Sequence, residues 1–192
     1  MGEFILVIGN GNWPSKALIQ TLIEKSDTII ALDGAADKFD SWDIVIGDMD
    51  SINNQEQYEA DTSQCDSDLA KALRRYDVNA VVGIEGGRLD HQLAAFTSLF
   101  ETNSNAIVYS DSWRACRVPI EGLELNLDIG TRCSIMPFGT VKGVNLNGCE
   151  YELSNQDIKT GTLGVGNKIN SNPVNVSHES GDLLFIWEAN VA

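Results

Sequence analysis

The chain has 192 residues, enough for one large domain or two small ones that each build a hydrophobic core. Hydrophobic residues make up 43% of the chain, a fraction that argues against disorder. Thirteen Lys and Arg against 28 Asp and Glu give a net charge of −15, which disfavours nucleic acid and anionic membranes as partners. An anionic ligand would have to arrive with a divalent cation.

The first part of the chain, residues 1–112, alternates two kinds of apolar pattern. Short apolar runs predict strands, and apolar residues spaced three and four apart predict helices. The predicted strands are 4–8, 28–32, 44–46, 80–84 and 106–109, and the predicted helices are 14–24, 67–76 and 89–100. Because the strands are almost continuously apolar and alternate with helices, we expect an α/β domain with a parallel sheet covered on both faces.

The second part, residues 113–192, contains short strand-like segments separated by closely spaced turn residues. These segments are 123–127, 133–137, 141–146, 151–153, 174–176 and 183–187. No helical period of any length interrupts them, so we expect an all-β sandwich domain. Residues 111–121 are expected to form the boundary between the two domains.

The cysteines and the first residues bear on the compartment. Met1–Ile8 lacks the basic region of a secretion signal, and no apolar run is long enough to span a bilayer. The four cysteines lie far apart and form no metal-binding pattern, which predicts free thiols in a reducing compartment. They are Cys65, Cys116, Cys133 and Cys149. We therefore expect a cytoplasmic protein.

The first of three acidic clusters directly follows an apolar strand. Asp48 and Asp50 lie two residues apart, and the carboxyl edge where they are expected is where parallel sheets bind ligands. Two carboxylates in one turn suit Mg²⁺, which commonly takes one or two carboxylates together with phosphate oxygens. The alternative is structural: Asp48 forms a turn and Ser51 caps a helix.

The second cluster, Asp66-Ser67-Asp68, opens a predicted helix with Lys71 one turn further along. Acidic residues at a helix start cap the helix and interact favourably with its dipole, contributing about 0.5–2 kcal/mol. This structural interpretation stands beside a catalytic one.

The third cluster is Gly86–His91, between a predicted strand and its helix. Two glycines let the backbone approach a phosphate at a helix N-terminus, and Arg88 can donate two hydrogen bonds to phosphate oxygens. Asp90 in the same loop would repel bare phosphate, so we expect it to face a metal ion or the proton of a nucleophile. A tight turn without function is the alternative.

Together the clusters bring several carboxylates and one arginine to the same predicted sheet edge. Unpaired carboxylates repel one another, and Mg²⁺ arriving with nucleotide phosphates would remove that repulsion. The chain has no P-loop and no Gly-x-Ser-x-Gly sequence. Of the two histidines, His178 is expected to be a surface residue without a role. The residues thus predict Mg²⁺-dependent phosphoryl or nucleotidyl transfer from a nucleotide.

Four segments resemble, in order, motifs of the thiamine pyrophosphokinase family. They are Asp33–Asp37, Ile46–Ser51, Ser67–Leu73 and Gly86–His91, and in the second half Gly148–Leu153 is similar to another family segment, with Tyr151 at its aromatic position. The combination of Gly-Asp-x-Asp-Ser with Gly-Gly-Arg-x-Asp-His is specific, and the resemblance covers essentially the whole chain. It implies an α/β domain followed by a β-sandwich, and transfer of pyrophosphate from ATP to thiamine, giving thiamine diphosphate and AMP.

The resemblance also implies roles for individual residues and a homodimer with sites at the subunit junction. The metal ligands would be Asp48, Asp50 and Asp68, and the catalytic residues Asp50, Asp68, Arg88 and Asp90. ATP or thiamine would be bound by Asn10, Asp33, Gly34, Lys71, Gly86, Gly87, His91 and Asn167.

The chain departs from the family pattern at a few positions. Cys65 occupies the place of an acidic residue, with Asp66 displaced by one, and Gly166 replaces the serine that precedes Asn167. These departures keep open a non-catalytic homologue that binds thiamine or a nucleotide. A second alternative is a nucleotide-sugar transferase that holds Mn²⁺ with Asp48 and Asp50, a scheme with no role for Gly86–His91.

Overall fold

The computed structural model describes residues 2–48 and 66–189. The chain divides between Asp111 and Ser112 into two compact units, each with its own strands. No helix in the described ranges is long and apolar enough to cross a membrane.

The described strands of the first unit form a parallel sheet, as their apolar pattern predicts. The strands are β1 (Ile5–Ile8), β2 (Thr28–Leu32), β3 (Ile44–Ile46), β4 (Ala80–Val82) and β5 (Ile107–Tyr109). Their order is β3-β2-β1-β4-β5, and each neighbouring pair is parallel. The chain runs outward from β1 to β3 and then returns to β4, so the direction of winding reverses between β1 and β4. Such a switch point is where open parallel sheets bind ligands.

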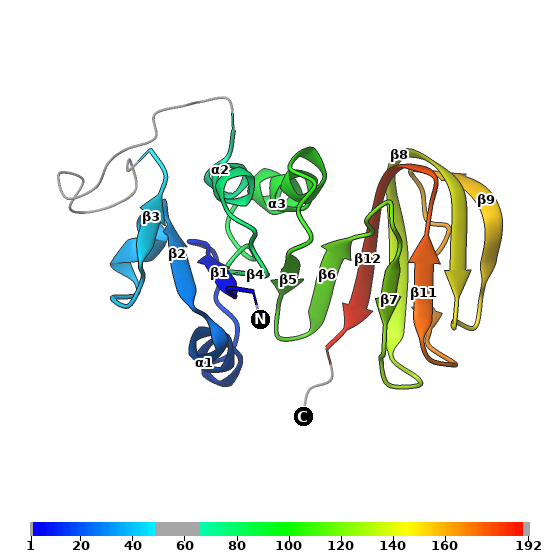
Figure 1. The fold of residues 1–192 in the computed structure, drawn as a ribbon, viewed down its shortest axis with the longest axis horizontal. Helices are drawn as coiled ribbons and strands as arrows, with labels where there is room; N and C mark the ends of the chain where they lie inside the picture. The colour runs from blue at the N-terminus through cyan, green and yellow to red at the C-terminus, as the bar shows by residue number, and fades with distance from the viewer. Residues whose placement is uncertain (1, 49–65, 190–192) are drawn as a thin grey trace. The chain divides into compact units, whose positions relative to one another are not determined.

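Helices lie on both faces of this sheet because right-handed crossovers of opposite direction fall on opposite faces. They are α1 (Lys16–Lys25), α2 (Asp68–Arg75) and α3 (Leu89–Glu101), with a 3₁₀ helix, η1 (Asp33–Asp37), directly after β2. Figure 1 shows α2 and α3 side by side above the strands and α1 below them. The predicted helices are therefore present.

Alternating residues of the strands build the core beneath α1. Leu6 and Ile8 of β1 pack with Ile19 and Leu22 of α1, and none of these side chains is more than 9% exposed. The intervening Val7 is also fully buried and points to the other face of the sheet. Burial on both faces explains why these strands are apolar throughout.

The described strands of the second unit pair in antiparallel fashion. They are β6 (Trp113–Arg117), β7 (Leu123–Leu125), β8 (Arg132–Asn147), β9 (Leu153–Lys159), β10 (Asn167–Lys168), β11 (Val174–Ser177) and β12 (Ser180–Glu188). The order is β6-β12-β8-β11-β7, and β9 and β10 also pair with β8. The long strand β8 thus takes part in two sheets, one with β12 and one with β9 and β11.

Three expectations for this unit need correction. The segments 133–137 and 141–146 belong to one strand, because Gly139 and Gly143 take positive φ values within β8 and bend it without ending it. Strand β6 lies inside the predicted boundary 111–121 and is held by long-range pairing with β12, which no local pattern reveals. The segment predicted at 151–153 is instead strand β9, which begins at Leu153.

His178 is also not the surface residue that we expected. The residue is 7% exposed, and its Nε2 lies 3.0 Å from the Val118 carbonyl oxygen. The turn between β11 and β12 carries the ring inward. The three described cysteines, Cys116, Cys133 and Cys149, are free thiols and buried, and burial raises the pKa of Cys116 to about 12.

Candidate active site

Three carboxylates from separate parts of the first unit converge at the carboxyl edge of its sheet. Asp33 follows β2, Asp48 follows β3, and Asp68 is the first residue of α2. Each offers an oxygen that lies within 4.8 Å of the other two. Asp33 is buried, and Asp48 and Asp68 are half-buried. We call Asp33, Asp48 and Asp68 the carboxylate cluster.

The donor set of this cluster fits a hard divalent cation. Mg²⁺ binds oxygen ligands at about 2.1 Å in an octahedron, so ligands on opposite sides of the ion lie about 4.2 Å apart. Adjacent ligands of the octahedron lie about 3 Å apart, so three carboxylate oxygens within 4.8 Å of one another need only small side-chain movements to reach one ion. Carboxylates held this close repel one another in the absence of a cation.

Asp33 reaches the cluster because the chain turns sharply after β2. Its φ is +39°, in the left-handed region that Asp tolerates better than most residues, and the next residues form η1. The family resemblance implied that Asp33 binds ATP or thiamine, whereas the structure brings Asp33 together with two predicted metal ligands. The third predicted ligand, Asp50, lies outside the described residues.

The start of α2 combines a helix cap with the cluster. Ser67 Oγ accepts a hydrogen bond from Ala70 N at 3.2 Å, so this serine caps the helix, and not the acidic residues that the structural interpretation expected to cap it. The next residue, Asp68, accepts a hydrogen bond from Lys71 Nζ at 3.0 Å. The Lys71 side chain is only 5% exposed. Lys71 was expected to bind ATP or thiamine, and in this structure its ammonium group lies against a cluster carboxylate.

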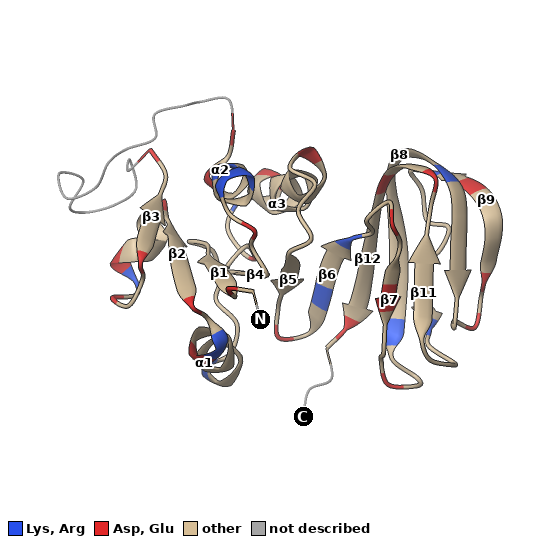
Figure 2. Cartoon of the chain, in the orientation of Figure 1, with Lys and Arg blue, Asp and Glu red and all other residues tan. Residues whose placement is uncertain are grey.

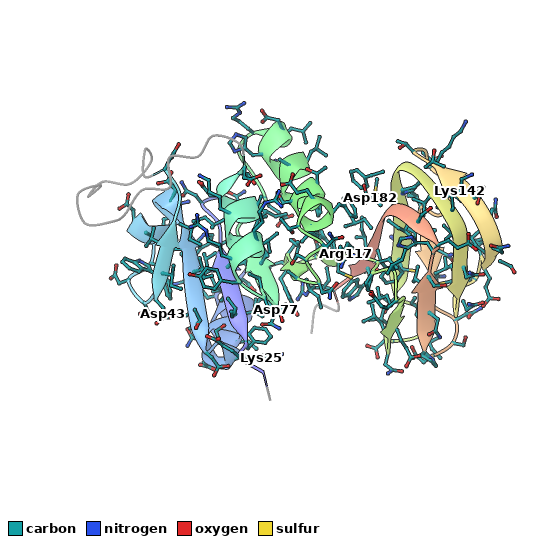
Figure 3. All side chains as sticks on the ribbon, turned by 45° about the horizontal axis from the view of Figure 1, so that its top comes forward. Lys25, Asp43, Asp77, Arg117, Lys142 and Asp182 are labelled. Carbon is teal, nitrogen blue, oxygen red and sulfur yellow. The ribbon has the colours of Figure 1, made fainter. Side chains whose placement is uncertain are left out.

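Other acids in the same part of the sequence have structural partners of their own. Asp66 receives two hydrogen bonds from Arg74, from Nε and Nη2, both at 3.2 Å, and this pairing raises the pKa of Arg74. Figure 2 shows the basic residues of α2 as a band on that helix. Asp43, labelled in Figure 3, accepts from Ile29 N at 2.8 Å, at the end of β2 away from Asp33. The acid-rich segment, which runs from Asp27 to Asp68 and contains twelve acidic residues and one basic residue, therefore serves several purposes.

The Gly86–His91 loop presents a paired charge at the start of α3. Arg88 Nε donates to Asp90 Oδ1 at 3.1 Å, and its Nη2 contacts the other carboxylate oxygen. The side chains of Arg88 and Asp90 are 73% and 60% exposed. The hydrogen bond from Arg88 lowers the pKa of Asp90. Asp90 is thus paired with Arg88 in this structure and is not part of the carboxylate cluster.

The loops that follow β1 and β4 are joined at the switch point by backbone hydrogen bonds. Gly9 N and Gly11 N donate to the carbonyls of Val82 and Gly83, both at 2.8 Å, and Asn12 N donates to Glu85 O at 2.6 Å. A Cβ on Gly11 would lie 2.4 Å from the Glu85 carbonyl oxygen, so only glycine permits this approach. In the sequence Gly9-Asn10-Gly11 marks the end of a strand, and of these three residues Asn10 alone was expected to bind ATP or thiamine.

Asn12 and Gln92 hold the phosphate-loop candidate Gly86 from two sides. A Cβ on Gly86 would lie 2.5 Å from Asn12 Nδ2, so the Asn12 side chain packs directly on this glycine. Gln92 Nε2 donates to the Gly86 carbonyl at 3.0 Å. Neither residue was singled out from the sequence, because neither contact has a local signal.

The remaining predicted site residues occupy varied settings. The Asn10 carbonyl oxygen accepts a hydrogen bond from Lys38 Nζ at 2.6 Å, and His91 N donates one to Asp90 Oδ1 at 3.1 Å. Gly34 is buried in η1, whereas Gly87 is exposed. In the second unit, buried Asn167 accepts from Tyr151 N at 3.1 Å and donates to Tyr151 O at 2.7 Å. The Asn167 amide therefore braces the segment that presents Tyr151, whose side chain is 72% exposed.

Both parts of the chain match models of known protein families. Residues 19–109 match "Thiamin pyrophosphokinase, catalytic domain", and residues 122–183 match "Thiamin pyrophosphokinase, vitamin B1 binding domain". A protein named "Thiamine pyrophosphokinase" from Bacillus subtilis (strain 168) is 30% identical over 161 residues, covering 73% of this chain and 75% of that protein.

Solved structures share the fold at low sequence identity. The crystal structure of thiamine pyrophosphokinase from Bacillus subtilis aligns with a TM-score of 0.77 at 23% identity, covering 98% of this chain and 100% of that one. Thiamin pyrophosphokinase from Candida albicans aligns with a TM-score of 0.78 at 15% identity, covering 97% and 90%. At these identities the likeness concerns the fold.

Proposed function

Because the chain belongs to the thiamine pyrophosphokinase family, we propose that it transfers the pyrophosphoryl group of ATP to the hydroxyl group of thiamine, forming thiamine diphosphate and AMP. The observation that carries this proposal is the carboxylate cluster. It is a feature of this chain's own structure, separate from the family match, and it suits a Mg²⁺-dependent transfer. The nucleotide-sugar transferase alternative has no counterpart among the matched families. A non-catalytic homologue would have no need for mutually repelling carboxylates.

We propose Asp33, Asp48 and Asp68 as the residues that hold Mg²⁺, with Asp50 as a further ligand predicted from the sequence. The ion would neutralise charge on the transferred group and orient it. The convergence of three carboxylates within 4.8 Å supports this assignment.

Lys71 and Arg88 would act in different ways. Lys71 donates a hydrogen bond to Asp68 Oδ1 at 3.0 Å and thereby holds this carboxylate in place. Arg88 is exposed and can exchange its hydrogen bonds from Asp90 to phosphate oxygens, beside the Gly86-Gly87 backbone. Asp90, once released from Arg88, could accept a hydrogen bond from the attacking hydroxyl group.

For the second unit, we propose that its two antiparallel sheets form a sandwich that contributes to binding thiamine. Exposed Tyr151, braced by Asn167, is the contact that the structure favours. This assigns Asn167 a supporting role in place of direct ligand binding. As the family resemblance implies, we also propose that the protein forms a homodimer. We propose that Asn10, Gly34 and His91 lie near the nucleotide. We further propose that the protein is located in the cytoplasm.

A product assay tests the proposed reaction. The full chain is incubated with MgCl₂, ATP and either thiamine, thiamine monophosphate or hydroxymethylpyrimidine, and nucleotides and acceptors are identified by mass spectrometry. We expect AMP and thiamine diphosphate in equal amounts, with thiamine as acceptor. Release of ADP, or tight binding of Mg-ATP without turnover of any acceptor, would contradict the proposal.

A further inference from the structure

Gly47 lies where two of the three cluster carboxylates approach each other. It follows β3, and because Leu32 pairs with Ile46 in the parallel ladder, Asp33 and Gly47 leave their strands side by side. Gly47 itself is buried. The position of Gly47 is therefore fixed by the pairing of the two strands.

No side chain fits at this position without moving a carboxylate. A Cβ on Gly47 would lie 2.8 Å from Asp33 Cβ, 3.2 Å from Asp33 Cα and 3.2 Å from Asp68 Oδ2. Contacts under 3 Å between carbon atoms are strongly repulsive, because favourable contact between carbons begins near 3.5 Å. A single methyl group would thus press on Asp33 and Asp68 together.

Neither carboxylate has an easy way to move aside. Asp33 is 8% exposed and lies between buried Leu32 and Gly34, at the entry to η1. The Oδ1 atom of Asp68 is held by Lys71, so that Oδ2 is the oxygen that faces Gly47. A methyl group at Gly47 would have to separate Asp33 from Asp68.

We propose that Gly47 is a positioning residue, whose missing side chain allows Asp33 and Asp68 to approach closely enough to share one cation. This inference rests on the proposed function of the carboxylate cluster and adds a determinant of its geometry. Gly47 does not itself bind the cation. It sets the distance between residues that do.

The test measures Mn²⁺ binding by the full-length G47A variant, using electron paramagnetic resonance without nucleotide or thiamine. Mn²⁺ replaces Mg²⁺ as a spectroscopic probe with similar ligand preference. We expect at least a tenfold weaker affinity than in the wild-type chain. The matched control is G130A, where φ is 94° and no atom lies within 4 Å of the added Cβ. It strains the backbone without crowding a carboxylate, so its Mn²⁺ affinity should equal that of the wild type.

A second variant addresses the case in which G47A does not fold. Asp33→Gly removes the nearest clashing atom, Asp33 Cβ, and glycine suits the φ of +39° at this position. The melting temperature should therefore fall less when Gly47→Ala is added to D33G than when it is added to the wild type. Equal losses in the two backgrounds would overturn the crowding that the inference requires.

The outcomes separate this inference from the proposed function. If the wild-type chain binds Mn²⁺ and G47A binds it equally well, the positioning role is wrong and the cluster remains a cation site. If the wild-type chain binds no Mn²⁺, the cation site itself is wrong, and the inference fails with it.

Discussion

The carboxylate cluster and the Arg88–Asp90 pair lie at the carboxyl edge of the same sheet but differ in how many acids they gather and how far these are buried. In the cluster, three acids lie within 4.8 Å of one another and are buried or half-buried. In the pair, one acid is neutralised by an adjacent arginine, and both side chains are more than half exposed. Three carboxylates held this close are costly to assemble and suit a bound cation, whereas an exposed acid paired with an arginine can exchange that partner for a ligand.

The largest effect should come from removing a cluster charge. Asp33→Asn keeps the shape of the side chain and removes its negative charge, so cation binding and turnover should fall by at least about 100-fold. Without metal, the variant should be at least as stable as the wild type, because repulsion within the cluster is reduced. Initial rates and thermal melts measure both quantities.

Asp43→Asn is the matched control for that variant. Asp43 belongs to the same acid-rich segment but lies at the far end of β2, and we expect wild-type turnover. Wild-type turnover by D33N as well would remove Asp33 from the cation site.

The next effect concerns the ion pair inside the cluster. Lys71→Met removes a buried ammonium group and leaves Asp68 without this partner, which should lower the free energy of unfolding by about 2 kcal/mol. This value is discounted because the Asp68 side chain is 28% exposed. Urea unfolding of K71M, D68N and the double variant measures the coupling between the two residues. Strictly additive losses would show that the pair contributes nothing.

A smaller effect is expected at the exposed pair. Arg88→Lys keeps the positive charge but loses the ability to donate two parallel hydrogen bonds, so the KM for ATP should rise about tenfold with little change in stability. Initial rates at varied ATP concentration measure it, and an unchanged KM would show that Arg88 does not bind phosphate.

The same pair allows a test by titration. Since the guanidinium of Arg88 lowers the pKa of Asp90, Arg88→Met should raise that pKa towards the ordinary carboxyl value. Adding Mg-ATP to the wild-type chain should shift the pKa in the same direction if Arg88 leaves Asp90 for phosphate. NMR detection of the Asp90 carboxyl carbon across pH measures both shifts.

The smallest effect is predicted for Asp66, two residues before a cluster member. Its carboxylate is paired with Arg74 on the helix surface, so Asp66→Asn should leave turnover unchanged and barely shift the urea midpoint. A loss of turnover like that expected of D33N would place Asp66 in the site. It would then be wrong to separate the carboxylate cluster from the acids that have a structural partner.

Some of the site could be predicted from the sequence because its residues lie next to strong local patterns. Asp48 follows an apolar strand and Asp68 opens an amphipathic helix, so both were expected at the sheet edge. Asp33 follows a strand too, but its membership in the cluster depends on a left-handed turn that many residues after a strand do not take. The pairing of Lys71 with Asp68 is equally a property of the folded chain.

The fold, like the site, has parts that could be predicted from local sequence patterns and parts that could not. The parallel sheet follows from continuous apolar runs, whereas strand β6 depends on pairing with β12, some 70 residues later in the sequence. The segments 133–137 and 141–146 were predicted as separate strands with Gly139 between them, because glycine commonly breaks strands. Pairing on both sides of β8 overrides that preference, and pairing is not visible in a local window.

The backbone hydrogen bonds between the loops after β1 and β4 affect the free energy of ligand binding at this edge of the sheet. Three backbone hydrogen bonds fix Gly9, Gly11 and Asn12 against the opposite loop before any ligand arrives. Ordering a loop costs conformational entropy, and here that cost is met during folding. These two loops are therefore already ordered in the free protein. A ligand that binds at this edge would lose little of its binding free energy to ordering the backbone.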